Sequence, residues 1–230
     1  MKPVVLSEME TVQWLVAGRL NMSRLGFCEC KLIFGRSGLA QAPDAMLAHR
    51  LRRLLRSEDK RTLVCLPRVF ETMPAGKAKW YDWITKPTLI DDLELAARTR
   101  GSTFVSRRDG WLDPVDEDAY WSLVRAQWQA RPVLLISGSG KGLKARDGFL
   151  DNAESVDVLQ APARDAWADY DAILADCLAW AGVKRDPFVY AALGATATIL
   201  CAELAEHGVQ AQDWGHAAQS WARRGERLAA

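Results

Sequence analysis

The sequence predicts an α/β fold of the Rossmann-like type, in which helices cover both faces of a mainly parallel sheet. Short, nearly continuous apolar runs recur along the chain, and amphipathic helical patterns lie between several of them. Strands that are buried on both faces read as continuous apolar runs, because neither face meets water. The 230 residues contain no convincing linker, so we expect a single domain that spans residues 1–230.

Six apolar runs are the expected strands, and a sheet of about six or more strands is within the normal range. These runs cover residues 62–67, 103–106, 132–138, 155–162, 188–194 and 209–215. Helices are expected at 43–56, 164–181 and 195–207, where apolar residues recur with a helical period. Residues 68–101 show no clear period and contain several aromatic residues, which indicates an excursion over the functional face.

The composition is that of an ordinary globular protein with little net charge. Hydrophobic residues make up 49% of the chain, and 30 basic residues balance 29 acidic ones to give a net charge of +1. No global field attracts the protein to nucleic acid or to an anionic membrane, so a local cluster must hold any anionic ligand. The apolar run near the N-terminus is too short for a signal peptide or a membrane span, so we expect neither there. We therefore expect no nucleic-acid partner and no membrane insertion.

The cysteines and tryptophans bear on location and on ligand binding. Five cysteines at irregular spacing give no disulfide framework, which favours a reducing, cytoplasmic compartment. Most of the ten tryptophans should be core residues. Four of them lie in loop-like or polar stretches, where an aromatic face could meet a ligand: Trp80, Trp83, Trp111 and Trp214.

Two loops that follow predicted strands are suited to an anion. In open parallel sheets, ligands bind beyond the carboxyl ends of the strands. Gly138 and Lys141 lie in "SGSGKG", where backbone N–H groups and an ammonium could meet a phosphate. Gly194 and Thr196 lie in "GATAT", which opens the helix at 195–207. A flexible turn explains the first loop equally well, and tight helix packing alone explains the second.

A third candidate follows the last predicted strand. Asp213 and His216, three residues apart, could share a proton or orient a hydroxyl group. With Ser139 they have the chain order of an α/β-hydrolase triad, although Ser137 occupies the first glycine position of the G-x-S-x-G elbow. A hydrolase is therefore a minor alternative, and a surface turn is the common explanation for such a pair.

The stretch "SRLGFCECKLIFG" contains two cysteines that flank a glutamate. A structural zinc site needs four ligands, and the remaining cysteines stand alone in apolar elements, so the number of ligands excludes zinc. C-x-C is also not the C-x-x-C pattern of thiol redox enzymes. Cys28 and Cys30 are therefore expected to be small packing residues beside Glu29.

Taken together, these segments resemble the glycosyltransferases of GT-D type fold, a bacterial family first catalogued as a domain of unknown function. "SRLGFCE" resembles the family's "ARFGDGE" and matches it at Arg24, Gly26 and Glu29. "TFVSRRD" resembles "TFISRP" through Ser106 and Arg107, and "FLDNA" resembles "LFDNA" through Asp151, Asn152 and Ala153. The most specific match is residues 192–216, which resemble "ALGPTAKVLAYDLSEHGYQALDIGH" from Gly194 to His216. The order of the motifs is kept over nearly the whole chain.

The resemblance implies transfer of a sugar from a nucleotide-diphosphate donor, commonly UDP-glucose, to a glycan or glycoprotein acceptor. It also implies a divalent cation, Mn²⁺ or Mg²⁺, that the Asp-x-Glu of the motif holds together with the donor diphosphate. Phe27 stands in place of the first of these acids, so Glu29 is the one metal-ligand candidate that remains. A non-catalytic nucleotide-binding or scaffold domain derived from such an enzyme is the alternative.

The resemblance also assigns roles to the candidate residues. The expected catalytic residues are Glu29, Asp213 and His216. The expected nucleotide-sugar-binding residues are Arg24, Gly26, Arg107, Gly138, Lys141, Asp151, Asn152, Gly194 and Thr196.

Overall fold

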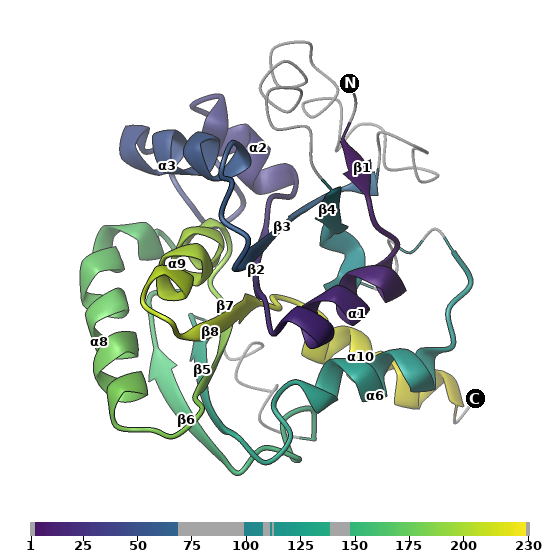
Figure 1. The fold of residues 1–230 in the computed structure, drawn as a ribbon. Helices are drawn as coiled ribbons and strands as arrows, with labels where there is room; N and C mark the ends of the chain where they lie inside the picture. The colour runs from purple at the N-terminus through teal and green to yellow at the C-terminus, as the bar shows by residue number, and fades with distance from the viewer. Residues whose placement is uncertain (1–2, 69–98, 108–110, 112, 139–147, 229–230) are drawn as a thin grey trace.

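A parallel sheet forms the centre of the molecule (Figure 1). The computed structural model describes residues 3–68, 99–107, 111, 113–138 and 148–228. Its strands are β1 (Val4–Val5), β2 (Asn21–Arg24), β3 (Thr62–Leu66), β4 (Thr99–Ser102), β5 (Pro132–Ser137), β6 (Ser155–Gln160), β7 (Phe188–Ala192) and β8 (Gln210–Asp213). They are ordered β1-β4-β3-β2-β8-β7-β5-β6, and every described pair is parallel. The predicted α/β class is confirmed.

Helices cover both faces of this sheet, as predicted. The described α-helices are α1 (Glu8–Gly18), α2 (Phe27–Ile33), α3 (Ala45–Leu55), α6 (Glu117–Ala126), α8 (Tyr170–Gly182), α9 (Ala195–Glu206) and α10 (Ala217–Leu228). One hydrophobic cluster joins the sheet to α2, α3, α8 and α9, and a second joins it to α1, α6 and α10. Figure 1 shows these two groups on opposite sides of the strands. Among the described residues, no helix is both long enough and apolar enough to cross a bilayer.

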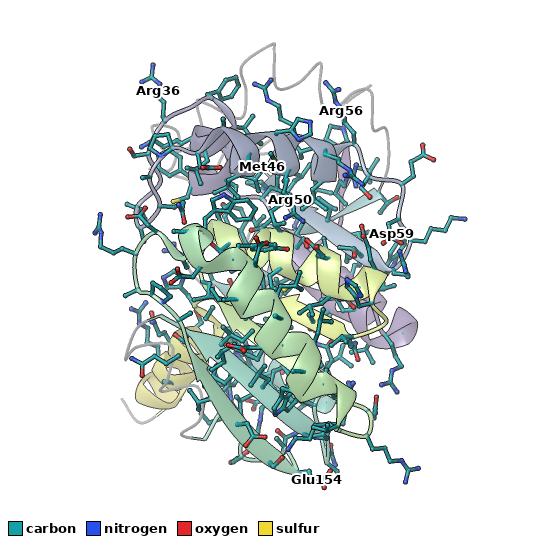
Figure 2. The ribbon with its side chains drawn as sticks, turned by 90° about the vertical axis from the view of Figure 1, so that its left-hand side faces the viewer. Arg36, Met46, Arg50, Arg56, Asp59 and Glu154 are labelled. Carbon is teal, nitrogen blue, oxygen red and sulfur yellow. The ribbon has the colours of Figure 1, made fainter. Side chains whose placement is uncertain are left out.

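Local signals fix where several helices begin. Ser7 and Glu10 form a capping box at α1, since the Glu10 amide donates to Ser7 Oγ (3.2 Å) and the Ser7 amide donates to Glu10 Oε2 (2.8 Å). Asp44 caps α3 by accepting from the Leu47 amide at 2.7 Å. The apolar stripe of α3 then faces the core, while Met46, labelled in Figure 2, remains 61% exposed.

The structure corrects the strand predicted at 103–106. These residues form a 3₁₀ helix, η2 (Thr103–Ser106), and the strand β4 lies just before them. Ser102 ends the strand, because its Oγ accepts from the Phe104 amide at 3.1 Å and so caps the turn. The β-branched and aromatic residues of "TFVS" favour a strand, but the cap overrides that preference. β4 itself begins inside the predicted excursion 68–101, most of which, 69–98, is outside the described residues.

Two strands were not predicted, because their sequences carry little strand signal. β1 has two residues, and β2 reads "NMSR". In β2, Asn21 is buried and its side-chain amide donates to the carbonyl oxygens of Cys201 (2.8 Å) and Val209 (2.9 Å). These bonds satisfy a polar side chain inside the core, so β2 forms without an apolar run.

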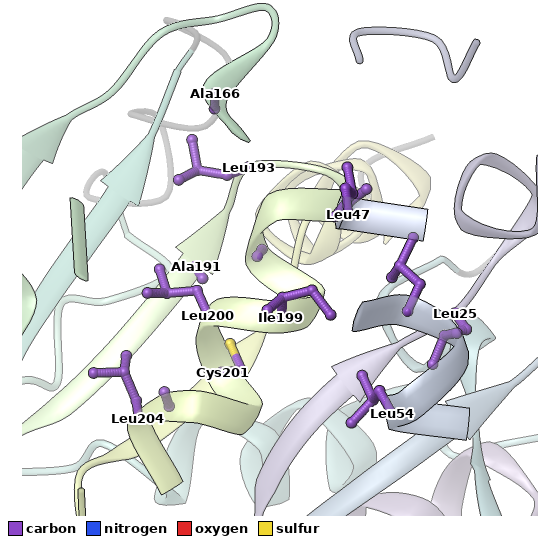
Figure 3. Close-up of a cluster of buried hydrophobic side chains, with 14 of the residues drawn as sticks. Leu25, Leu47, Leu54, Ala166, Ala191, Leu193, Ile199, Leu200, Cys201 and Leu204 are labelled. Atoms are coloured by element: carbon purple, nitrogen blue, oxygen red, sulfur yellow. The ribbon is translucent and has the colours of Figure 1, made fainter. Parts of the chain in front are cut away.

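Helix α9 packs at the centre of one hydrophobic cluster. Ile199, Leu200 and Leu204 are buried between the sheet and the neighbouring helices, and Leu47 and Leu54 of α3 belong to the same cluster on one side of α9 (Figure 3). Burying one such side chain contributes roughly 1.5–3 kcal/mol. α9 is thereby held firmly, which fixes the position of its first turn at the carboxyl edge of the sheet.

The second cluster is aromatic, and it corrects the expectation for one tryptophan. Trp214 is fully buried, and its ring centroid lies 6.2 Å from that of Trp128. Its indole N–H donates to Gln212 Oε1 at 2.9 Å. Trp214 is therefore a core residue rather than a ligand platform. Trp111 is partly buried and donates to the Phe104 carbonyl at 2.9 Å. Trp80 and Trp83 lie outside the described residues.

The connections of the sheet create a switch point. β5 and β7 are neighbours, yet the chain passes from β5 outward to β6 and from β7 in the opposite direction to β8. In open parallel sheets such a point opens a crevice at the carboxyl ends of the two strands. Gly138 and Gly194, which follow these two strands, therefore border the expected ligand crevice.

Candidate functional site

Two charged residues at the carboxyl edge of the central strands form the core of the candidate site. Arg24 ends β2, and Asp213 ends the neighbouring strand β8. The Arg24 Nη2 lies 2.7 Å from Asp213 Oδ1, and its Nε donates to the Asp213 carbonyl oxygen at 2.5 Å. Both side chains are largely buried, with 13% and 4% exposed. The pair is therefore a shielded, charge-assisted contact.

The guanidinium of Arg24 also contacts η2 and lies close to the turn after β8. Its Nη1 donates to Ser106 Oγ in η2 and reaches the Thr103 carbonyl oxygen at 3.4 Å. Gly215, with φ +43°, lies so close that a Cβ there would be 2.3 Å from Nη2. Arg24 is thus fixed in place and orients Asp213. Sequence reasoning missed Gly215, although a glycine two residues after a strand is the signal for such a close approach.

Glu29 is a buried carboxylate on the first turn of α2. Its Oε2 accepts from the Gly26 amide at 2.8 Å, which closes the helix in the manner of a capping box. Burial, with a smaller contribution from the negative charge of Asp213, raises the pKa of Glu29 to about 7, although backbone hydrogen bonds and the charge of Arg24 oppose the shift. A carboxyl group that titrates near neutrality is suited to accept a proton.

Asp213 is the second buried carboxylate of the site. Burial raises its pKa above the ordinary value, and the Arg24 charge and hydrogen bond oppose that increase. The charges of Asp213 and Arg24 both act on Glu29. The structure therefore brings Arg24, Gly26, Glu29 and Asp213, four of the residues predicted for the site, to one place.

The loops after β5 and β7 lie on the same edge of the sheet. Gly194 adopts φ +56° and ψ −138°, a conformation that L side chains rarely adopt, and no described atom lies within 4 Å of where its Cβ would be. Gly138 is necessary for packing, since a Cβ there would be 2.4 Å from the Pro162 carbonyl oxygen. Lys141 and Ser139 lie outside the described residues.

Residues 40–42, in the segment that follows α2, pack beside the start of α9 and are bonded to Asp165 and Thr196. The Ala42 amide donates to Asp165 Oδ1 at 2.5 Å, and the Asp165 amide donates to the Ala40 carbonyl at 2.8 Å. Gln41 in the same segment accepts from Thr196 Oγ1 at 3.5 Å. Thr196, predicted to bind nucleotide, is fully buried here. Sequence reasoning did not predict these contacts, because they join residues 123 to 155 positions apart in the chain.

The remaining predicted residues are placed differently. Arg107 follows η2 and His216 follows β8, and both are exposed. Asp151 and Asn152 precede β6 and so lie at the amino edge of the sheet, opposite to Arg24 and Asp213. There Asp151 pairs with Arg125, and the Asn152 amide donates to the Arg125 carbonyl at 3.0 Å. The structure does not bring these two residues to the other candidates.

The cysteines are packing residues, as expected. All five are free, and Cys30, Cys65, Cys177 and Cys201 are buried. Burial raises the pKa of the Cys28 and Cys30 thiols, so both remain protonated near neutral pH.

The donor atoms around Glu29 do not fit a tightly held Mn²⁺ or Mg²⁺ ion. Phe27 offers no ligand atom, Glu29 Oε2 is engaged by the Gly26 amide, and Asp213 Oδ1 is engaged by Arg24. Within the described part of the chain, no group of three or more His, Cys, Asp or Glu residues is placed to hold a metal ion. These cations need several oxygen ligands, so the protein alone lacks a suitable set here.

Comparison with known proteins identifies the family. The model of the glycosyltransferase GT-D fold matches residues 22–225. The chain belongs to the glycosyltransferase GT-D fold family. A solved "new glycosyltransferase" from Streptococcus sanguinis has a TM-score of 0.84 to this GT-D chain and is 27% identical to it, and the match covers 97% of this chain and 86% of that one. A structure of the domain of unknown function 1792 has a TM-score of 0.87 at 26% identity and covers 98% of this chain and 82% of its own.

Curated relatives of this GT-D chain are longer proteins. A probable glycosyl transferase Gly of Streptococcus gordonii is 28% identical over 220 residues, which is 92% of this chain and 32% of that protein. Glycosyltransferase GlyD of Streptococcus pneumoniae is 25% identical over 220 residues, 90% of this chain and 26% of that protein. The chain thus spans about a third or less of the length of these two curated relatives.

Proposed function

We propose that this chain is a glycosyltransferase that transfers a sugar from a nucleoside-diphosphate donor, a UDP-sugar, to a glycan or glycoprotein acceptor. The observation that carries the proposal is the pair of buried carboxylates, Glu29 and Asp213, beside Arg24 at the carboxyl edge of a GT-D sheet. The strand order changes direction between β5 and β7, where a donor crevice is expected, and Gly138 and Gly194 follow these two strands.

The reaction replaces one bond at the anomeric carbon of the sugar. The acceptor hydroxyl oxygen forms a bond to that carbon, the bond from carbon to the phosphate oxygen breaks, and UDP leaves with the electron pair. Glu29 accepts the proton of the hydroxyl group, a role that its pKa of about 7 suits. Asp213, held by Arg24, accepts hydrogen bonds from sugar hydroxyls. Cations must neutralise the charge that grows on the leaving diphosphate.

A donor-hydrolysis assay with UDP-sugars tests this function. Glu29→Gln and Asp213→Asn should each lower turnover by about 10²-fold or more, the scale typical for removal of a positioned acid or base. Asp59→Asn is the matched control, since Asp59 precedes β3 at the opposite edge of the sheet, where it binds Arg61. Turnover that both site variants retain would contradict the assignment.

The second candidate is a non-catalytic nucleotide-binding or scaffold domain derived from such an enzyme. Phe27, in place of the first acid of the "DGE" motif, favours it. Calorimetric titration with UDP separates the two candidates. UDP binding without turnover of any UDP-sugar supports the second, whereas turnover supports the first.

We place the reaction in the cytoplasm, with no nucleic-acid partner and no insertion into the membrane. Five free cysteines and a net charge of +1 support this placement.

A further inference from the structure

An aromatic ring and a lysine occupy the start of α2, where the related motif has an acid. Phe27 is the first residue of the helix, and Lys31 follows four positions later on the same side. The Lys31 Nζ lies 5.3 Å from the centroid of the Phe27 ring. This geometry is a cation–π contact, in which the ring face attracts the ammonium. The ring therefore holds the Lys31 ammonium beside position 27, where the family motif has an acid.

Lys31 and a second cation, Arg107, act on the same neighbouring thiol. The positive charges of Lys31 and of Arg107 both act to lower the pKa of Cys28, the residue after Phe27, although burial raises it overall. The two cations come from different elements, α2 and the segment after η2. Both charges therefore act on Cys28, which precedes Glu29 in the first turn of α2.

Arg24 is not available for the same task. Its Nε, Nη1 and Nη2 atoms donate to Asp213, Ser106 and Thr103, and Gly215 closes over Nη2. Turning toward a ligand would break these bonds and leave Asp213 buried without a partner. A diphosphate at this edge must be neutralised by other groups.

We propose that Lys31, positioned by the Phe27 ring, supplies to the donor diphosphate the positive charge that a divalent metal would otherwise supply, so that this chain binds its donor without a metal. The inference rests on the function proposed above. The identity of residue 27 supports this proposal. An acid there would attract a metal ion, whereas the aromatic ring of Phe27 attracts the ammonium of Lys31. Lys31 then contacts the phosphates as a mobile point charge with three donors.

The test is calorimetric titration of the whole chain with UDP, once with EDTA and once with added Mn²⁺. The wild-type dissociation constant should differ by less than about twofold between the two conditions. Lys31→Ala should weaken UDP binding about tenfold or more, as expected for loss of a charged hydrogen-bond donor. Lys31→Arg should retain most of the affinity. Phe27→Leu should weaken UDP binding about two- to fivefold, since it removes only the ring that positions the ammonium.

Lys60→Ala is the matched control, because Lys60 is an exposed lysine that precedes β3 at the amino edge of the sheet. It should bind UDP like the wild type, and circular dichroism should show that every variant is folded. Binding that requires Mn²⁺ would overturn the inference while leaving the glycosyltransferase function intact. Equal UDP affinity of Lys31→Ala and the wild type would also overturn it. A wild-type chain that binds no UDP under either condition would overturn both proposals.

Discussion

Arg24 and Asp213 are joined at two points, side chain to side chain and side chain to backbone. Nη2 lies 2.7 Å from Oδ1, and Nε lies 2.5 Å from the Asp213 carbonyl oxygen. Because Arg24 ends β2 and Asp213 ends β8, the contact fixes the carboxyl ends of two adjacent strands. The bond from Arg24 to Ser106 extends this connection to η2. One guanidinium therefore determines the relative positions of three elements of the site.

Removing Arg24 should destabilise the fold strongly. Arg24→Ala leaves Asp213 buried without its partner, which typically costs about 3–5 kcal/mol. Urea unfolding followed by circular dichroism measures the loss. Arg19→Ala is the control, because Arg19 pairs with Asp186 at the surface, where the two side chains are 61% and 48% exposed. It should cost about 1 kcal/mol or less, and equal losses for the two variants would contradict the prediction.

A methyl group at Gly215 should disturb the same contact. Gly215→Ala places a Cβ 2.3 Å from Arg24 Nη2 in a backbone with φ +43°. Gly208→Ala is the matched control, since Gly208 has φ +74° but no described atom within 4 Å of its Cβ position. The control should lose only the backbone cost of about 1–2 kcal/mol. In urea unfolding, Gly215→Ala should lose clearly more free energy of unfolding than Gly208→Ala. A smaller loss than the control would show that the Arg24 side chain moves aside at little cost.

The sequence predicts most of the sheet, because five of its strands are apolar runs that alternate with helical patterns. It fails where a strand is short or polar, as at Val4–Val5 and Asn21–Arg24. β2 is stabilised by bonds from Asn21 to Cys201 and Val209, about 180 residues away, and no local pattern encodes such contacts. At 103–106, the capping bond of Ser102 outweighs the strand propensity of the residues after it.

Prediction of the site is uneven for a similar reason. Asp213 is predicted from its position after a strand, whereas Arg24 and Glu29 are predicted only through the resemblance of "SRLGFCE" to the family motif, because β2 has little strand signal. The structure brings the three together because β2 and β8 are adjacent parallel strands that end at one edge. The motif match at Asp151 and Asn152 has no such geometric basis, and these residues lie at the other edge beside Arg125. The engagement of Arg24 by Asp213 and Ser106 depends on side-chain packing, which the sequence alone does not show.

The hydrogen bonds of Asp165 should protect the segment that follows α2 from proteolysis. It has φ +53° and binds the backbone of Ala40 and Ala42. Asp165→Ala removes the acceptor for Ala42 and strains the left-handed backbone, so trypsin should cleave after the exposed Arg36 several-fold faster. Asp165→Asn tolerates the same backbone and keeps an acceptor oxygen, so it should resist trypsin like the wild type. Mass spectrometry of the fragments identifies the cleavage site, and unchanged cleavage in Asp165→Ala would contradict the assigned role.

Glu29 should make the stability of the protein depend on pH in an unusual direction. Its pKa is raised from 4.5 to about 7 in the folded state. The folded state therefore binds the proton more tightly than the unfolded state between these values. The contribution of Glu29 is most favourable below pH 4.5 and is lost as pH rises to about 7, by on the order of 3 kcal/mol at most.

Glu29→Gln tests this dependence without removing the cap, because Gln serves equally at the third position of a capping box. Its free energy of unfolding should rise relative to that of the wild type between pH 5 and pH 8, as urea unfolding at each pH measures. Glu10→Gln is the control, since Glu10 has the same capping role in α1, but its hydrogen bonds with Ser7 lower its pKa. Relative to the wild type, that variant should show the opposite sign: it loses stability as pH rises toward 4.5, and the difference then stays constant from pH 5 to pH 8. If Glu29→Gln and the wild type keep a constant difference from pH 5 to pH 8, Glu29 does not titrate near neutrality, and its assignment as the proton acceptor of the transfer reaction fails with it.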